Sequence, residues 1–186
     1  MKHEGAFAKK QRYAVLLRGI NVGGNKKVPM VRLREILTQA GFDDVASYIQ
    51  SGNIVLSSTM TAPKVEEKVA SLITDEFGFD VAVMVRSGAD VAKTLAGNPY
   101  PDGDAAQTAI WFTTTAIPAS QREAAKQVVP AGRERFMITS KEIYVDFGGR
   151  MSDSKLSDQL LKLIKVEVTA RNLRTVAKLV EMLDDH

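Results

Sequence analysis

The chain has 186 residues, of which 45% are hydrophobic and 25% are charged, as is typical of a soluble globular protein. The formal net charge of +3 helps an anionic partner approach, but it is too small to indicate nucleic-acid binding by itself. Cys is absent, and His3 and His186 are the only histidines. Disulfides, thiol nucleophiles and cysteine metal sites are therefore excluded, and we expect neither a metal nor a cofactor.

The N-terminal residues 1–12 carry charges but lack the apolar segment of a secretory signal. No apolar run in the chain is long enough to span a bilayer. We therefore expect a cytoplasmic protein with no membrane contact, in which residues 1–12 form a mobile tail. The oligomeric state cannot be predicted from these features.

A first half is predicted over residues 13–97. The apolar run 13–17 indicates a buried strand that leads into a glycine-rich loop, and Pro29 starts a helix that ends at Gly41. The remaining predicted elements are strands at 45–50 and 54–57 around the turn 51–53, a helix at 63–77, a strand at 81–86 and a helix at 88–96. The order β-α-β-β-α-β is the ferredoxin-like pattern.

The turn-rich connection 98–103 separates this half from a second one over residues 104–186. Its predicted elements are a strand at 108–115, a helix at 118–128, a hairpin of strands at 134–139 and 142–147, a helix ending at 165, a short stretch at 166–169 and a last helix at 172–183. We predict an α/β (α+β) fold of duplicated ferredoxin-like βαββαβ halves with an additional C-terminal helix. Both alternating faces of 13–17 and of 109–112 are apolar. We therefore expect the second face of each sheet to be covered, by the other half.

The polar loop after residue 17 and the turn 50–53 should share one end of the first sheet, because a 4-1-3-2 strand order makes strands one and three antiparallel neighbours. Together they form a predicted cluster of hydrogen-bond donors with almost no carboxylate, which suits an anion. Its members are Arg18, Gly19, Asn21, Gly23, Gly24, Asn25, Lys26, Lys27, Gln50, Ser51, Gly52 and Asn53.

Two other readings of this loop stay open. The glycines can serve only positive-φ turns, and Ser51-Gly52-Asn53 is ordinary hairpin chemistry. The spacing from Gly19 to Gly24 approaches that of a phosphate-binding P-loop, but the following Asn25-Lys26-Lys27 lacks the required Lys then Ser or Thr. A nucleoside triphosphatase is therefore not expected.

A further polar stretch lies at 169–175. Thr169 or Asn172 can cap the last helix. Alternatively Arg171, Asn172 and Thr175, with Arg174, add to the donor cluster.

At these residues a family resemblance emerges. Leu16-Leu-Arg-Gly-Ile-Asn-Val-Gly-Gly24, with Met30 and Leu33 after it, resembles the domain of unknown function 1697 family of bacterial proteins, and Tyr48-Ile-Gln-Ser-Gly-Asn53 is similar to its second signature. The residues 154–156 and 169–172 look like its C-terminal motifs, except that Leu173 stands where the family usually has Trp. The resemblance implies two ferredoxin-like halves and no established activity.

These observations predict a binding protein for a phosphate-bearing small molecule or nucleotide at the glycine-rich loop. Nucleic acid, held by backbone contacts, is the main alternative, and an enzyme with an anion clamp is another. Whether the protein is an enzyme stays open, because no acid or base can be assigned near the cluster.

Overall fold

The structure, a computed structural model, describes residues 9–184. The mobile tail predicted for residues 1–12 falls mostly on residues 1–8, which lie outside the described residues. The first strand begins at Gln11, two residues earlier than predicted, and Arg12 donates from Nη2 to the carbonyl of Met182 at 2.7 Å. None of the helices in the described part of the chain has the length and apolar character needed to cross a bilayer.

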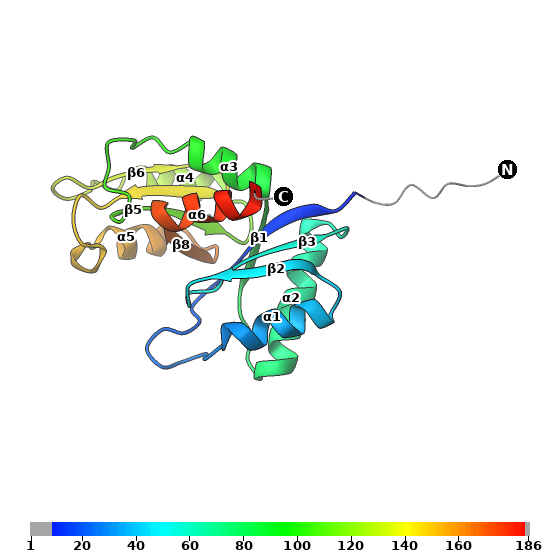
Figure 1. Cartoon of the computed structure of the whole chain (residues 1–186). Coiled ribbons are helices and arrows are strands. Elements are labelled where there is room, and N and C mark those ends of the chain that lie inside the picture. The colour runs from blue at the N-terminus through cyan, green and yellow to red at the C-terminus, as the bar shows by residue number, and fades with distance from the viewer. Residues whose placement is uncertain (1–8, 185–186) are drawn as a thin grey trace.

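The first half forms a four-stranded antiparallel sheet with the order β2-β3-β1-β4, which confirms the predicted order of strands (Figure 1). Ser87 caps α3 (Gly88–Ala96), its Oγ accepting from Asp90 N at 3.1 Å. The elements of this half are β1 (Gln11–Leu17), α1 (Met30–Gln39), β2 (Asp43–Tyr48), β3 (Asn53–Ser58), α2 (Ala62–Phe77), β4 (Val83–Ser87) and α3 (Gly88–Ala96).

The second half forms another antiparallel sheet with the order β6-β7-β5-β8, which is the same order counted from its own first strand. This common order is what a duplicated βαββαβ unit would produce, and the duplication itself stays a prediction. The elements are β5 (Thr108–Thr113), α4 (Ala119–Ala125), β6 (Arg135–Ile138), β7 (Glu142–Asp146), the 3-10 turn η1 (Met151–Asp153), α5 (Leu156–Leu163), β8 (Val168–Asn172) and α6 (Leu173–Asp184).

The prediction was wrong at β8. It placed a short stretch at 166–169 and began the last helix at 172, whereas the structure has a full strand to Asn172 that pairs with β5. The cause is the pattern of burial: Thr169 and Arg171 point inward, so the buried positions of this strand are polar. Asn172 then caps α6, since its Oδ1 accepts from Thr175 N at 2.9 Å.

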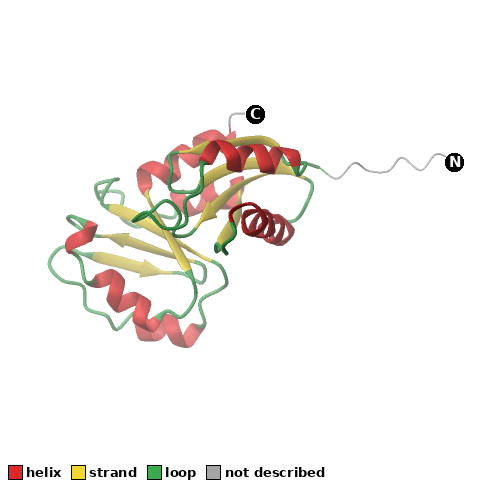
Figure 2. Cartoon of the chain, turned by 90° about the horizontal axis from the view of Figure 1, so that it is seen from below, coloured by secondary structure: helices red, strands yellow, loops and turns green. Residues whose placement is uncertain are grey.

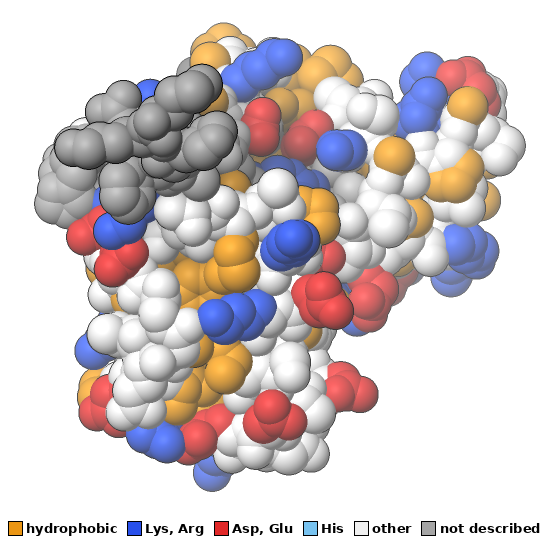
Figure 3. Space-filling view, turned by 90° about the vertical axis from the view of Figure 1, so that its right-hand side faces the viewer, with side chains coloured by type: hydrophobic (Ala, Val, Ile, Leu, Met, Phe, Trp, Pro, Cys, Tyr) orange, Lys and Arg blue, Asp and Glu red, His pale blue; other side chains and the backbone are white. Residues whose placement is uncertain are grey.

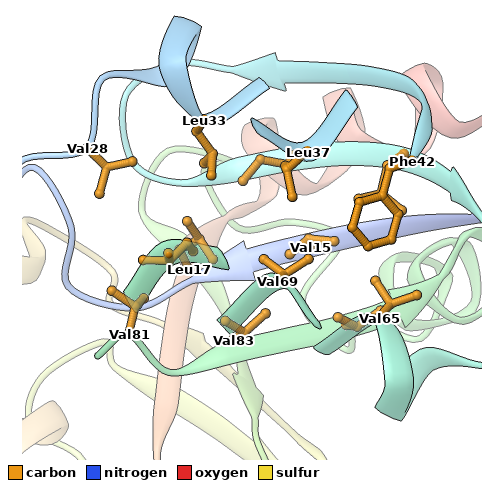
Figure 4. Packing of buried hydrophobic residues seen from close by; sticks show 14 of the residues in the cluster. Val15, Leu17, Val28, Leu33, Leu37, Phe42, Val65, Val69, Val81 and Val83 are labelled. Carbon is orange, nitrogen blue, oxygen red and sulfur yellow. The ribbon is translucent and has the colours of Figure 1, made fainter. Parts of the chain in front are cut away.

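Helices cover the outer face of each sheet. Val15 and Leu17 of β1 pack against Leu33 and Leu37 of α1 and against the valines of α2, as Figure 4 shows. On the second sheet, Trp111 lies in the corresponding core with α4 and α5. Figure 2 shows both sheets, in yellow, with their helices.

The inner faces of the two sheets share a third core, in which α3 and α6 lie side by side (Figure 1). Leu16 of β1 and Phe112 of β5, both fully buried, belong to this core together with Val176 and Leu179 of α6. The expectation that both faces of the central strands are covered, with the other half contributing, is therefore confirmed.

The turn between β2 and β3 is held against β1 by Gly52. This residue has a φ of +81°, and a Cβ built on it would lie 2.7 Å from Cβ of Leu17 and 3.0 Å from Cδ1 of Ile20. Gly24 has a similar φ of +77°, but a Cβ there would have no neighbour within 4 Å. The two glycines thus share a backbone conformation and differ in the space around it.

We expect Gly52→Ala to lower the free energy of unfolding by about 3 kcal/mol, from left-handed strain and overpacking together, and Gly24→Ala by only about 1 kcal/mol, from strain alone. Urea unfolding of the two variants, followed by circular dichroism, measures the difference. If the two variants lose the same free energy of unfolding, the contact with Leu17 does not contribute to the cost of Gly52→Ala.

Candidate functional site

The glycine loop, residues 18–27, ends in a small hairpin. Asn21 N donates to Lys26 O at 3.1 Å and Asn25 N donates to Val22 O at 3.2 Å. Gly23 and Gly24 form the two central residues of this turn, with φ of +59° and +77°. Two consecutive positive φ values are those of a type I′ turn, so both glycines have a conformational reason to be there.

Asn21 fastens this hairpin to the body of the protein. Its Nδ2 donates to Val28 O at 3.0 Å and to Gln50 O at 2.7 Å, and its Oδ1 accepts from Val28 N at 2.8 Å. The structure therefore brings the glycine loop and the turn 50–53 together, as the antiparallel pairing of β1 and β3 requires. The same bonds occupy the Asn21 amide in bracing backbone.

Asn53 has a similar internal role. It is fully buried, and its Nδ2 donates to Tyr48 O at 3.1 Å and to Ser51 Oγ at 2.9 Å, while its Oδ1 accepts from Nε of Arg171. The Asn53 amide is thus held between its own turn and a side chain of the second half.

Arg171 joins the two halves through several hydrogen bonds. From β8 its Nη2 donates to Leu17 O at 2.8 Å and to Ser51 O at 2.9 Å, and its Nη1 donates to Thr169 Oγ1 at 2.7 Å. The residue is 8% exposed. Burial lowers the pKa of its guanidinium to about 10, because desolvation disfavours the charged form, yet the group stays protonated at neutral pH.

Of the other predicted residues, some join the cluster and some do not. Arg18 lies at its rim and pairs with Glu167 at 3.0 Å, so the cluster has a carboxylate from the second half that was not expected. Lys26 Nζ donates to Asp80 O at 2.6 Å, and Gly19 adopts a φ of +66°. Asn172 and Thr175 belong to the start of α6 instead, where Asn172 is the cap.

Leu173, which replaces the Trp expected from the family resemblance, lies in the core between the sheets. It is 9% exposed. The position is therefore part of the hydrophobic packing of α6, where Leu is an adequate filler.

Sequence reasoning missed Arg86, the counterpart of Arg171. Arg86 lies on β4, the strand of the first sheet that corresponds to β8 in the second. Each arginine donates through Nη1 to the carbonyl of the residue before it, at 3.1 Å for Arg86 and 2.8 Å for Arg171. Each also donates through Nη2 to the last residue of the other half's first strand: Arg86 to Thr113 O at 2.7 Å and Arg171 to Leu17 O at 2.8 Å.

The two arginines differ at Nε. That of Arg171 donates to Asn53, the first residue of β3. That of Arg86 lies 4.0 Å from Oε1 of Glu142, the first residue of β7, and it is buried with no hydrogen-bond acceptor among residues 9–184. The signal that could have found Arg86 is its place directly after the apolar run 81–85, as Arg18 follows the run 13–17.

A hollow of about 400 Å³ opens beside Arg86, between α3 and the β6–β7 hairpin. A second hollow, of about 530 Å³, lies near Arg135, but that guanidinium is already paired with Asp146 and Asp102. Within residues 9–184 no three His, Cys, Asp or Glu side chains gather in a way that could hold a metal ion. Of these two hollows, the one beside Arg86 is lined by an arginine whose buried Nε has no acceptor among residues 9–184.

These features define a two-sheet α/β protein whose halves exchange arginine contacts. The chain matches the family described as Protein of unknown function (DUF1697) over residues 10–144, and it belongs to that family, as its motifs indicated. It also resembles the conserved bacterial protein SP0830 from Streptococcus pneumoniae, with 31% identity, a TM-score of 0.75, and coverage of 95% of this chain and 100% of that chain. No curated protein matches it.

We expect Arg171→Met to lower the free energy of unfolding by about 3 kcal/mol, because it leaves the buried acceptors of Leu17, Ser51 and Asn53 without their charged donor. The matched control is Arg174→Met on α6, whose side chain is 68% exposed and 3.9 Å from Asp104, and which should cost no more than about 0.5 kcal/mol. Urea denaturation provides the comparison. An Arg171→Met protein as stable as the Arg174→Met control would contradict a role in joining the halves.

Proposed function

We propose that the protein binds the phosphate group of a small molecule or nucleotide at the tip of the glycine loop. One observation carries the proposal: the N–H groups of Gly23 and Gly24 have no acceptor among residues 9–184. A Cβ at either position would meet nothing within 4 Å, so the space over the turn is open. Consecutive backbone N–H groups of this kind favour anions.

The charges around the tip support the same class of ligand. Lys26 and Lys27 follow the turn directly and are exposed. Lys26 donates to the backbone carbonyl of Asp80, and it makes no ion pair within residues 9–184. The carboxylate at the base of the loop, Glu167, is paired with Arg18. A phosphate would therefore meet two N–H groups and two ammonium groups with little competing negative charge.

The site supports binding rather than catalysis. The asparagines that the sequence placed in it are held by internal hydrogen bonds, and Arg171 is enclosed between the halves. Among the described residues, the buried polar side-chain atoms without a hydrogen-bond partner belong to Arg12, Arg86, Thr108 and Trp111, and none of these is a carboxylate or a histidine. Because the tip is exposed, we expect weak affinity, with a dissociation constant of about 1 mM.

The proposal predicts that pyrophosphate and ATP shift the amide signals of Gly23 and Gly24 in a ¹⁵N NMR titration. The double variant Lys26→Gln, Lys27→Gln should bind about tenfold more weakly, since it loses two charge contributions of less than 1 kcal/mol each. Lys64→Gln, at an exposed lysine of α2, is the control and should bind normally. Signals of Gly23 and Gly24 that stay in place at saturating ATP would end the proposal.

Nucleic acid held by its backbone is the competing partner, and the projecting position of the loop favours it (Figure 1). Against it, Lys and Arg side chains are interspersed with Asp and Glu on the described part of the face in Figure 3, without a broad basic surface there. A single-stranded oligonucleotide in the same titration decides between them. Binding that is tighter than that of ATP and falls steeply with salt would favour nucleic acid.

A further inference from the structure

The hollow beside Arg86 lies where the two halves meet, a common position for small-molecule sites. Its walls come from α3 and β4 of the first half and from the β6–β7 hairpin of the second. Its volume of about 400 Å³ is at the lower end of the range for ligand sites. This size suits a molecule as small as an amino acid better than a dinucleotide.

The floor of the hollow is positively charged but incompletely satisfied. The Arg86 side chain is 11% exposed, and its Nε lacks an acceptor in the described chain. In the equivalent contact of the other half, the Nε of Arg171 donates to the Asn53 amide. The Glu142 carboxylate that takes the corresponding place is 4.0 Å away and accepts instead from Thr139 Oγ1 at 2.8 Å.

The rim carries both signs of charge. Lys93 on α3 and Lys141 in the hairpin are exposed, and neither makes an ion pair within residues 9–184. Asp90 and Glu142 add two carboxylates. With Arg86 the wall holds three cations and two anions. A polyphosphate would meet these carboxylates, whereas a ligand with one carboxylate and one ammonium group could pair with both kinds.

The wall also carries a thioether and an aromatic ring, from Met137 and Tyr144, beside Thr94, Gly97 and Thr139. Tyr144 is 4% exposed, and its hydroxyl donates to Thr94 O at 2.9 Å, so the hydroxyl proton is already engaged within the protein. Burial raises the pKa of Tyr144 to about 12, which keeps this donor protonated. Met137 of the hairpin is 37% exposed at the mouth of the hollow. A thioether and an aromatic ring together accept an apolar or aromatic side chain.

We propose that this hollow binds a free α-amino acid with an apolar or aromatic side chain. Its carboxylate lies toward Arg86, Lys93 and Lys141. Its ammonium group lies toward Glu142 and Asp90, and its side chain contacts Met137 and Tyr144. The site is separate from the glycine loop and does not depend on the phosphate site proposed there.

A ¹⁵N NMR titration of the full chain with L-leucine, L-methionine and L-phenylalanine tests the existence of the site. At least one of them should shift the amide signals of residues 90–94 and 141–144 at about 10 mM ligand. The signals of Gly23 and Gly24 should stay in place, which separates this site from the phosphate site. No shift in the 90–94 and 141–144 segments with any of the three amino acids would overturn the proposal.

Analogues of L-phenylalanine test the two charges. Phenethylamine lacks the carboxylate and 3-phenylpropionate lacks the ammonium group, and each should bind at least about tenfold more weakly, the equivalent of losing about 1.4 kcal/mol. If either analogue binds as tightly as L-phenylalanine, the proposed recognition of both charges is wrong. If pyrophosphate binds at these segments more tightly than the amino acids, the hollow is an anion site and the proposal is also wrong.

Glu142→Gln distinguishes recognition from structure, because the amide can still accept from Thr139 while the negative charge is lost. This variant should weaken L-phenylalanine about tenfold and leave 3-phenylpropionate bound as well as before or better. Glu123→Gln, at an exposed residue of α4, is the matched control and should change neither. A Glu142→Gln protein that loses both ligands equally, or neither, would contradict the assigned role.

Discussion

The structure depends on a buried guanidinium. Arg171 extends from the second sheet to the end of β1 and the start of β3. There it donates to the carbonyl oxygens of Leu17 and Ser51 and to the side-chain oxygen of Asn53. Desolvating an arginine is costly, so its burial is sustained only because nearly every N–H finds an oxygen. The loops that extend from these strand ends, including the glycine loop, therefore have a fixed base. Hydrophobic contact alone would hold the halves together without setting their relative position, whereas directed hydrogen bonds set it.

The reciprocal contact made by Arg86 gives the molecule an approximate symmetry with one difference. Both arginines bind the last carbonyl of the other half's first strand, at 2.7 and 2.8 Å. Only one finds a neutral amide at the first residue of the facing strand; the other finds a carboxylate at 4.0 Å. The contact of Arg171 is fully hydrogen-bonded, whereas a hollow between the halves lies beside Arg86. A small molecule between two halves of a protein can use groups from both, which neither half could supply alone.

Much of the fold could be predicted from the sequence, because hydrophobic patterning is a local property. The runs at 13–17 and 109–112 are apolar on both faces, and the structure indeed places each between two layers of packing. The extent of β8 was predicted wrongly because its inward residues are Thr169 and Arg171, and the pattern that identifies strands assumes that buried residues are apolar. The meeting of the glycine loop and the turn 50–53 followed from strand order. The internal hydrogen bonds of Asn21 and Asn53 could not be predicted in this way, because the sequence does not show which acceptors lie near each donor. Arg86 and Glu142 are far apart in sequence, so their approach depends on how the halves dock.

Helix α6 is the last described element of the chain, yet it lies against β1 and β3 as well as β5 and β8. During synthesis, which proceeds from the N-terminus, the inner surface of the first sheet exists long before the helix that covers it. Ala14, Leu16, Val55 and Met84 must then wait, uncovered, for the rest of the polypeptide to leave the ribosome. The first sheet can therefore reach its native packing only after the whole chain has been synthesised. A nascent fragment that ends before α6 exposes an apolar surface that is prone to aggregation and is of the kind that chaperones bind.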